Sequence, residues 1–180
     1  DTDLDVVAGY QSGFNRIYLN TGAGAFAAAR PFGIGDEWTF SLALGDLDND
    51  GDLDIVAGNY NEQNAVYLND AHGNFTTRLP FGPEDDWTRS VAVGDLNADG
   101  VLDVIVGNEG QQNFVYFNDG AAGFPISRPF GPGADWTYAV AVADLDADGD
   151  LDIVVGNNGE QNAVYLNDGV GLFNWTTPAA

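Results

Sequence analysis

The stretch Asp46-Leu47-Asp48-Asn49-Asp50-Gly51-Asp52-Leu53-Asp54 places oxygen-bearing side chains at alternate positions around a glycine. Calcium prefers many oxygen ligands, and a short loop of carboxylates and carbonyls supplies them. Glycine tolerates the positive φ that brings the two ends of such a loop together. The stretch is therefore predicted to be a calcium-binding loop.

The same pattern returns at 95–103 and at 144–152, so each copy begins 49 residues after the previous one. A repeat near this length is typically one supersecondary unit that becomes stable only when its neighbours stack on it. The chain is thus predicted to be a single repeat domain, with units at 1–36, 37–85, 86–134 and 135–180.

Within one unit the side-chain pattern is typical of β-strands. The segment 90–94 has small side chains that suit a strand in a confined space. The segments 102–107 and 113–118 are nearly continuous apolar runs, which fit strands buried on both faces. Phe124 opens a shorter, more polar fourth strand after the turn residues 118–120. Because no stretch keeps a helical period, essentially no helix is predicted beyond turns.

Four antiparallel strands per unit, repeated radially with small residues on the first, describe the blades of a β-propeller. The predicted fold class is all-β, a β-propeller-type repeat array of four-stranded antiparallel blades. The first unit differs, because Asp1-Thr2-Asp3-Leu4-Asp5 aligns with 50–54 and the preceding strand is missing. We therefore expect three complete blades and one three-stranded partial blade.

An incomplete blade exposes an unpaired strand edge and half of a metal site. The chain has no methionine and no signal peptide, which suggests a processed or excised piece of a longer parent chain. The other expectation is self-association through the incomplete first blade, in which copies either close into a ring or continue as a filament.

The repeating unit resembles the FG-GAP or VCBS repeat. The residues that carry the resemblance are Gly-Asp-Leu-Asp-Asn-Asp-Gly-Asp-Leu-Asp-Ile-Val-Ala-Gly-Asn at 45–59, Tyr-Leu-Asn-Asp at 67–70 and Gly-Asn-Phe at 73–75. Repeats of this family build calcium-binding β-propellers in bacterial surface proteins, some fungal lectins and the heads of integrin α-subunits. The resemblance implies the fold and the metal, and it is compatible with adhesion, sugar binding or display.

Each complete loop is predicted to hold one calcium ion, so three ions are expected, with a fourth if the partial site is completed. The expected ligands are four side chains and one backbone carbonyl per loop. They are Asp46, Asp48, Asp50, the Asp52 carbonyl and Asp54; Asp95, Asn97, Asp99, the Val101 carbonyl and Asp103; and Asp144, Asp146, Asp148, the Asp150 carbonyl and Asp152. The partial site consists of Asp1, Asp3 and Asp5. Because Asn97 removes one charge, its loop is expected to bind calcium most weakly of the three.

Other interpretations of the acidic loops fit less well. An EF-hand needs a bidentate glutamate at its twelfth position and flanking helices, and the sequence predicts neither. Magnesium is disfavoured by the many protein oxygens, and zinc by the absence of cysteine and the single histidine. Polar turns, or a halophilic or merely well-solvated acidic surface, are the interpretations without a metal.

The chain carries 28 acidic and 5 basic residues, for a formal net charge of −23. Such a surface repels nucleic acid and anionic lipid and attracts cations. No apolar run is long enough to predict insertion into a membrane. A metal in each repeat would replace the disulfides that often stabilise small exported domains. An extracellular or cell-surface location is expected because loops of this kind suit millimolar calcium.

Three tryptophans precede the first strands of successive units beside acidic residues: Trp38, Trp87 and Trp136. Large aromatic residues at the structural period usually fill the same gap in every blade, so packing between blades is the simpler interpretation. The alternative is a surface on which a sugar ring stacks. The recurring Arg-Pro-Phe-Gly connections, at 30–33 and 128–131 with a variant at 78–82, are expected to serve turns and the core between blades.

Asn74 and Asn174 begin sequons for N-glycosylation and are candidate attachment sites. His72 lies in a turn and is expected to be exposed to solvent. No serine has a recurring base beside it, and the aspartates are spaced as cation ligands rather than as an acid and base pair. We therefore expect no enzyme activity.

Two functions remain. One is a calcium-stabilised extracellular repeat module for adhesion or ligand binding, with carbohydrate as a candidate ligand. The other is a structural protein that assembles end to end into a filament or surface array. The unchanged recurrence of 64–70 at 162–168 favours tiling, because a unique ligand site would appear as one deviant unit, although it also allows a multivalent lectin.

Overall fold

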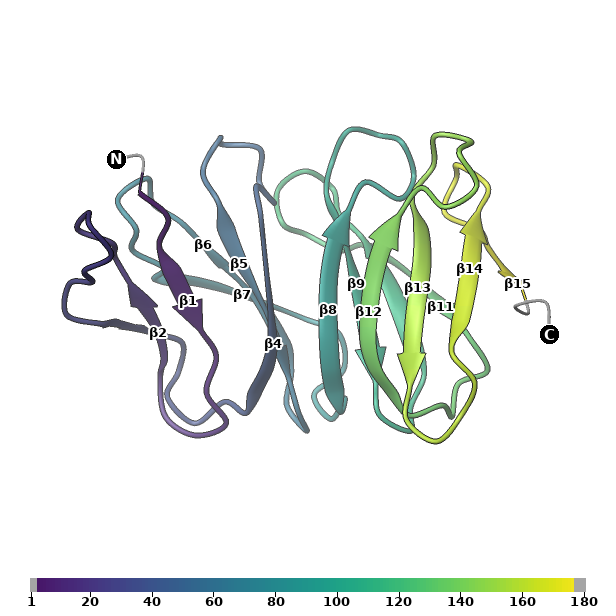
Figure 1. Ribbon diagram of the computed structural model, residues 1–180, viewed down its shortest axis with the longest axis horizontal. Helices are drawn as coiled ribbons and strands as arrows, with labels where there is room; N and C mark the ends of the chain where they lie inside the picture. Colours follow the sequence, from purple (N-terminus) through teal and green to yellow (C-terminus); the bar gives the residue numbers. More distant parts are fainter. Residues whose placement is uncertain (1–2, 177–180) are drawn as a thin grey trace.

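The structure, a computed structural model, describes residues 3–176 as four antiparallel sheets placed side by side, which we call blades 1 to 4 (Figure 1). Blade 1 contains β1 (Val6–Ala8), β2 (Asn15–Tyr18) and β3 (Arg30–Phe32). Blade 2 contains β4 (Thr39–Gly45), β5 (Asp54–Asn59), β6 (Asn64–Leu68) and β7 (Thr77–Phe81). Blade 3 contains β8 (Thr88–Gly94), β9 (Asp103–Asn108), β10 (Asn113–Phe117) and β11 (Ile126–Phe130). Blade 4 contains β12 (Thr137–Ala143), β13 (Asp152–Asn157), β14 (Ala163–Asn167) and β15 (Phe173–Thr176).

This architecture confirms the predicted all-β repeat array, with three four-stranded blades and one three-stranded blade. Residues 3–176 contain no helix, and so none that could cross a membrane. One boundary was wrong, because the fourth strand of blade 3 begins at Ile126 and not at Phe124. The intervening Pro125 has no N–H to donate to a strand ladder. The Phe124 ring instead packs 4.9 Å from the ring of Phe81 in blade 2.

The second strand of each complete blade lies inside its sheet, between two hydrogen-bonded neighbours. β5 and β9 are buried along their whole lengths, as the apolar runs predicted. In β9 the side chains of Val104, Ile105 and Val106 have no exposed surface. Burial of one such side chain stabilises the fold by about 1.5–3 kcal/mol, so β5 and β9 contribute strongly to the stability of blades 2 and 3.

Glycines in the second strands allow neighbouring blades to approach closely. A Cβ atom at Gly58 would lie 2.7 Å from Val91 Cγ1, and one at Gly107 would lie 2.8 Å from Val140 Cγ1. Each of these valines belongs to the first strand of the following blade. The recurring Gly-Asn pair of the sequence therefore serves packing between blades.

A buried chain of hydrogen bonds recurs at each junction between blades. Between blades 2 and 3, Asn64 Nδ2 donates to Thr88 Oγ1 at 3.0 Å, and the Thr88 hydroxyl donates to Asn108 Oδ1 at 2.9 Å. The other two junctions repeat it with Asn15, Thr39 and Asn59, and with Asn113, Thr137 and Asn157. All three residues of the middle junction are fully buried, so their polar groups depend on one another.

The connections between blades insert a phenylalanine into the junction, as expected from the Pro-Phe-Gly pattern. Each buried ring meets the edge of a tyrosine ring in the next blade at 5.1–5.4 Å: Phe32 with Tyr67, Phe81 with Tyr116, and Phe130 with Tyr165. Such edge contacts add about 0.5–1.5 kcal/mol to the burial of the rings.

The four blades do not close into a ring, since blade 1 and blade 4 lie at opposite ends of the row, with blades 2 and 3 between them (Figure 1). The leucine that follows the first aspartate of each acidic loop differs in exposure between the inner blades and the last blade. Leu47 and Leu96, which a following blade covers, are 0% and 1% exposed, whereas Leu145 of blade 4 is 49% exposed.

Candidate functional site

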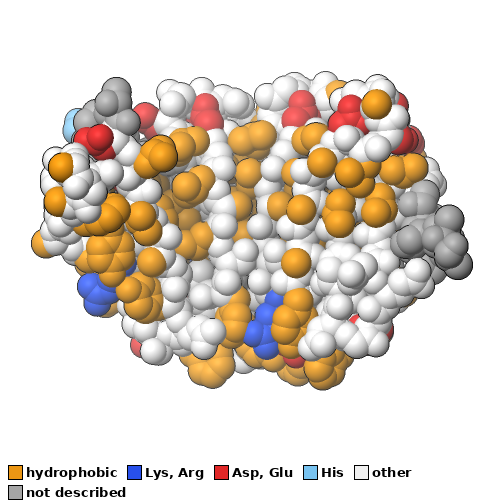
Figure 2. Space-filling model, in the orientation of Figure 1, with side chains coloured by type: hydrophobic (Ala, Val, Ile, Leu, Met, Phe, Trp, Pro, Cys, Tyr) orange, Lys and Arg blue, Asp and Glu red, His pale blue; other side chains and the backbone are white. Residues whose placement is uncertain are grey.

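The three acidic loops lie at one edge of the molecule. Each connects the first and second strands of its blade, and Figure 1 places all three connections at the upper edge. Figure 2 shows acidic side chains gathered along the same edge, while hydrophobic side chains spread over the face and basic side chains lie nearer the opposite edge. The two ends of the blades therefore differ in chemistry.

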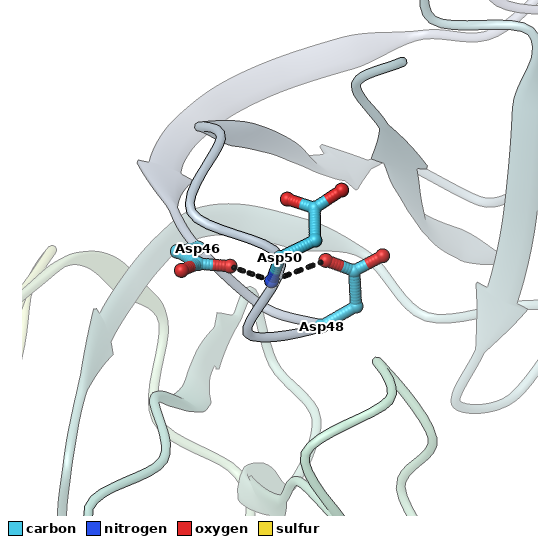
Figure 3. Close-up of side chains that lie close together, drawn as sticks. All are labelled: Asp46, Asp48 and Asp50. Atoms are coloured by element: carbon cyan, nitrogen blue, oxygen red, sulfur yellow. Dashed lines mark hydrogen bonds between the residues drawn. The ribbon is translucent and has the colours of Figure 1, made fainter. Parts of the chain in front are cut away.

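In the first complete loop, backbone N–H groups hold the carboxylates in a ring. The Asp50 N–H donates to Asp46 Oδ1 at 3.1 Å and to Asp48 Oδ1 at 3.3 Å (Figure 3). The Gly51 N–H donates to Asp46 Oδ2 at 3.1 Å, and its φ of +96° is in the region that the sequence analysis assigned to it. Asn49 also has a positive φ, of 59°, which the sequence did not reveal.

Oxygen atoms converge in two of the loops. One carboxylate oxygen from each of Asp46, Asp48 and Asp50 lies within 4.8 Å of the others, and the same holds for Asp144, Asp146 and Asp152. In the middle loop Asn97 Nδ2 donates to Asp99 Oδ2 at 2.9 Å, so this loop has one charged ligand fewer and its amide occupies an oxygen of a neighbouring carboxylate. This is consistent with the expectation that the middle loop binds a cation most weakly.

The last aspartate of each complete loop also has a structural role. Asp54 is fully buried, and its two oxygens accept from the backbone N–H groups of Leu47 and Asn69, both at 2.9 Å. Asp103 and Asp152 accept from the equivalent N–H groups of their own blades. Burial raises the pKa of the Asp103 carboxyl to about 6.

The donor set of these loops fits a hard cation. The groups are oxygens, they are crowded, and no ion pair with an arginine reaches them within the described residues. Burial, followed by repulsion from Asp50, raises the pKa of the Asp48 carboxyl, and burial and Asp148 do the same for Asp146. A divalent cation would relieve that repulsion.

The partial first site is described only in part. Asp1 lies outside the described residues, and Asp3 is exposed to solvent. Asp5 Oδ1 accepts from the Asn20 N–H at 2.7 Å, which is the same contact that Asp54 makes with Asn69. Blade 1 thus retains one of the two backbone contacts that the last aspartate makes in the complete loops.

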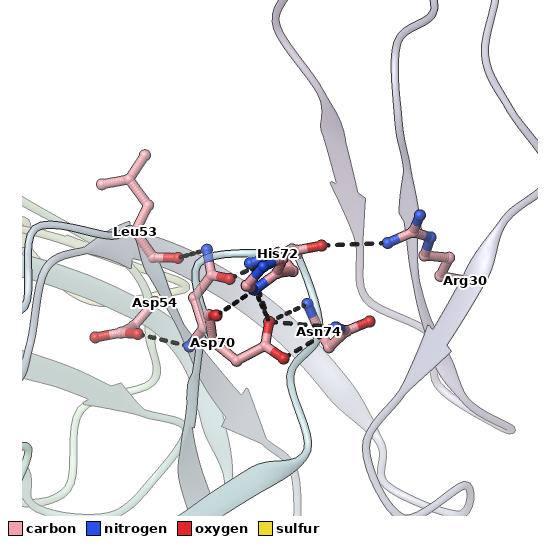
Figure 4. Close-up of polar contacts among 8 residues, drawn as sticks. Arg30, Leu53, Asp54, Asp70, His72 and Asn74 are labelled. Carbon is pink, nitrogen blue, oxygen red and sulfur yellow. Dashed lines mark hydrogen bonds and ion pairs between the residues drawn. The ribbon is translucent and has the colours of Figure 1, made fainter. Parts of the chain in front are cut away.

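The turn after β6 contains both His72 and the first sequon. Asp70 Oδ1 accepts from the N–H groups of His72 and Asn74 at 3.0 and 3.1 Å (Figure 4). The His72 side chain is 80% exposed, which confirms the expectation for it. Asn74 Nδ2, the atom to which a glycan would be attached, donates to Asp70 Oδ2 at 2.9 Å. Asn174 is exposed in β15, and glycosylation at either site stays a prediction.

The three tryptophans lie at the edge opposite the acidic loops, because each precedes the first strand of a blade. Trp38, Trp87 and Trp136 are 50%, 41% and 47% exposed. Packing between blades therefore explains only the buried part of each indole ring. The interpretation that these tryptophans only fill gaps between blades was wrong for the exposed part. The exposed part of each ring is free to contact a ligand.

Trp38, Trp87 and Tyr60 line one cleft. The Tyr60 ring stacks 6.5 Å from the Trp38 ring and 5.4 Å from the Trp87 ring, with interplanar angles of 21° and 25°. Asn61 and Glu62 complete the lining of a cavity of about 330 Å³. Asn61 Oδ1 accepts from Trp87 Nε1 at 3.4 Å, and Glu62 Oε2 accepts from the Trp38 N–H at 3.3 Å.

Arg89 organises the aromatic residues beside this cleft. Its guanidinium carbon lies 4.3 to 5.1 Å from three ring centres, those of Phe40, Tyr60 and Tyr138. Arg89 Nε also donates to Glu109 Oε2 at 2.6 Å. The sequence analysis missed Tyr60 and Arg89. A signal was available, since these residues break the repeat: the equivalent positions 49 residues later hold Glu109 and Tyr138.

Asp86 is a buried acid without an adequate partner. It is 6% exposed, and its Oδ2 has no hydrogen-bond partner within the described part of the chain. Burial, followed by repulsion from Asp85, raises the pKa of Asp86 to about 6 from an ordinary 3.8. The folded state therefore favours the neutral carboxyl, and this contribution to stability is lost as the pH rises from about 4 through 6.

We expect Asp86→Asn to raise the free energy of unfolding by about 2 kcal/mol at pH 7.5, because it removes an unpaired buried charge. At pH 4.5 the gain should be much smaller, since the native carboxyl is then largely protonated. Urea unfolding of both proteins at the two pH values measures the difference, and effects of pH on calcium binding cancel in the comparison. An equal gain at both pH values would contradict the assignment.

Comparison with known proteins gives a family match and a fold match. The model for the FG-GAP-like repeat matches residues 1–57, 46–106 and 96–155. A lectin from Agrocybe aegerita, solved in a study of its specific recognition of non-reducing terminal N-acetylglucosamine, is 26% identical with a TM-score of 0.61. The match covers 95% of this chain and 47% of the lectin chain.

A second solved structure, that of BBS1N in complex with ARL6DN, is 13% identical with a TM-score of 0.58 and shows the fold alone. That match covers 98% of this chain and 59% of the other, so the chain spans about half the length of the solved chains that it matches. A search of the curated proteins finds no match.

Proposed function

This chain belongs to the FG-GAP-like repeat family, and from that membership we propose that it is a calcium-stabilised extracellular module that binds carbohydrate without catalysis. FG-GAP repeats are typical of extracellular or surface proteins and often bind calcium. The likeness to the Agrocybe aegerita lectin supports a carbohydrate as the class of ligand.

The observation that carries the proposal is the pair of half-exposed indoles around the 330 Å³ cleft. One face of a pyranose ring presents C–H bonds, which pack against an aromatic ring, while its hydroxyl groups need polar partners at the ring edge. Trp38 and Trp87 supply the aromatic surfaces, and Asn61 and Glu62 supply an amide and a carboxylate. Concave sites with a mainly apolar lining and a few placed polar groups are the usual form of ligand sites.

Calcium has a structural role in this proposal. When bound, the ion would neutralise the crowded carboxylates of each loop and fix the turn between the first and second strands. Asp46, Asp48 and Asp50 would hold it in blade 2, and Asp144, Asp146 and Asp152 in blade 4. Because these loops and the tryptophans lie at opposite ends of the blades, calcium would not bridge protein and sugar.

The test is glycan binding by a Trp87→Ala variant. We expect the intact protein to bind a subset of glycans on an array, and Trp87→Ala to bind them at least tenfold more weakly, a loss of about 1.4 kcal/mol or more. Ile126→Ala is the matched control, because Ile126 is an exposed apolar residue of the outer strand β11, away from the cleft. Equal binding by both variants, or no glycan binding at all, would contradict the proposal.

A second candidate function is end-to-end assembly of copies into a filament or surface array. The observation that favours it is the 49% exposure of Leu145, at the position where blades 2 and 3 bury a leucine under the next blade. A further blade would cover this face, whether it comes from the same polypeptide or from a second copy. Light scattering at several protein concentrations in millimolar calcium distinguishes open-ended growth from a single mass.

A further inference from the structure

A cavity of about 610 Å³ lies between blades 3 and 4, away from the tryptophan cleft. Its lining combines aromatic rings with acids and amides. The residues that matter for its chemistry are Asp135, Glu160, Gln161, Ala163 and Tyr165. The corresponding junctions between the other blades show what this space accommodates.

Between blades 1 and 2 the corresponding space holds the side chain of Arg78. Its guanidinium pairs with Glu37, with Nη2 and Nε each 3.0 Å from Glu37 Oε1. Nε also lies 3.3 Å from the Tyr67 hydroxyl, and Nη2 donates to the Gln63 carbonyl at 3.4 Å. One arginine side chain thus contacts a carboxylate, a phenol and a backbone carbonyl.

The three partners of Arg78 recur in the cavity between blades 3 and 4. Glu37, Tyr67 and Gln63 correspond, two repeats of 49 residues later, to the cavity-lining residues Asp135, Tyr165 and Gln161. The arginine itself does not recur. The backbone of Tyr67 pairs with that of Arg78, whereas the backbone of Tyr165 pairs with that of Trp175, a residue without charge.

The junction between blades 2 and 3 differs in another way. There Phe114 occupies the position that is Ala65 in blade 2 and Ala163 in blade 4, and its ring packs 5.8 Å from the Tyr116 ring. Phenylalanine thus adds apolar volume to one junction, and arginine fills another. The cavity beside Asp135 and Ala163 has the binding groups of the arginine junction and the small residue that leaves room for a ligand.

Asp135 is half-buried and lacks a cation. Asn157 Nδ2 donates to Asp135 Oδ2 at 3.3 Å, and no ion pair reaches Asp135 within residues 3–176. Burial and repulsion from Glu160 raise the pKa of the Asp135 carboxyl, as is expected for an acid that faces another acid. The formal net charge of −23 also draws cationic ligands toward the protein.

We propose that the cavity between blades 3 and 4 binds a guanidinium group on an aliphatic stem, as presented by an arginine side chain of a peptide. Asp135 would accept hydrogen bonds from the planar fork, which matches a carboxylate better than an ammonium group does. Tyr165 and the Gln161 carbonyl would take the positions that Tyr67 and the Gln63 carbonyl take around Arg78.

The test is a titration of the calcium-loaded protein with acetyl-arginine methylamide, followed by NMR chemical-shift changes in about 150 mM salt, which screens the general attraction of an acidic surface. Acetyl-citrulline methylamide, a neutral analogue of similar shape, and acetyl-lysine methylamide are the comparison probes. We expect the arginine probe to bind at least tenfold more tightly than either. Equal binding of the arginine and citrulline probes would overturn the proposal, and equal binding of arginine and lysine would overturn its preference for guanidinium.

Two variants localise the site. Asp135→Asn should weaken binding of the arginine probe at least tenfold, and Ala163→Phe, which copies the residue of blade 3, should abolish it. Glu84→Gln is the matched control, because it removes one negative charge from an exposed position outside the cavity. If Glu84→Gln weakens binding as much as Asp135→Asn does, or if Ala163→Phe binds normally, the cavity is not the site.

Discussion

Removal of calcium with EDTA is expected to lower the melting temperature of this protein by about 20 °C. A site held at 100 times its dissociation constant adds about 2.7 kcal/mol, so three sites add about 8 kcal/mol. For a chain of this size, 1 kcal/mol corresponds to about 2–4 °C. Without the ion, Asp46, Asp48 and Asp50 repel one another across less than 4.8 Å. Melting curves by circular dichroism in millimolar calcium and in EDTA measure the shift.

Two controls make the calcium experiment specific. Magnesium at the same concentration should restore little of the lost stability, because it keeps its own water shell. An Asp48→Asn/Asp146→Asn variant should show a smaller difference between calcium and EDTA, because two loops each lose a charged ligand. A melting temperature that is the same in calcium and EDTA would mean that the loops are only polar turns.

Replacement of Arg78 by alanine is expected to cost about 3–5 kcal/mol of stability, because it leaves a buried carboxylate without its cation. The side chain of Glu37 is 2% exposed and that of Arg78 is 24% exposed. Glu37 also accepts from the Tyr67 hydroxyl at 2.5 Å, so three side chains depend on one another. Urea unfolding in saturating calcium measures the loss.

The stability lost in Arg78→Ala should come mainly from the unpaired Glu37 carboxylate and not only from the lost packing of the arginine side chain. A second change, Glu37→Gln, should therefore restore part of the stability in the Arg78→Ala background. If Glu37→Gln restores no stability in the Arg78→Ala background, Arg78 stabilises the fold only by packing.

Most of the fold could be predicted because the same pattern of strands and loops recurs in each repeat. The 49-residue spacing placed each loop and each blade, and the apolar run at 102–107 located β9 within one residue. The start of β11 was less predictable, because Phe124 looks like a strand residue while Pro125 keeps the ladder from forming there. Local composition alone does not show which aromatic ring turns into the junction.

The candidate sites were predictable only where the ligands lie close together in sequence. The carboxylates of one acidic loop lie within nine consecutive residues, 46–54, so their chemistry was readable. The tryptophan cleft joins Trp38 and Trp87 with Tyr60 from between them, and only the packing of blades 2 and 3 shows that these rings stack. The ligand proposed for the cavity at Asp135 was inferred by comparison with Arg78. The contact of Arg78 with Glu37 joins residues 41 positions apart, so the sequence alone does not show it.

Isothermal titration of the chelated protein with calcium tests the central claim most directly, because it counts the ions that the repeats hold. We predict about three ions bound per chain at millimolar calcium, with the loop at 95–103 filling last because Asn97 stands in place of an aspartate. In the Asp48→Asn/Asp146→Asn variant, both changed loops carry asparagine at the position of Asn97, so we also predict that these two sites weaken and fill only at calcium concentrations close to those that fill the middle loop. Absence of any binding at millimolar calcium would contradict the account of this chain as a calcium-stabilised repeat module.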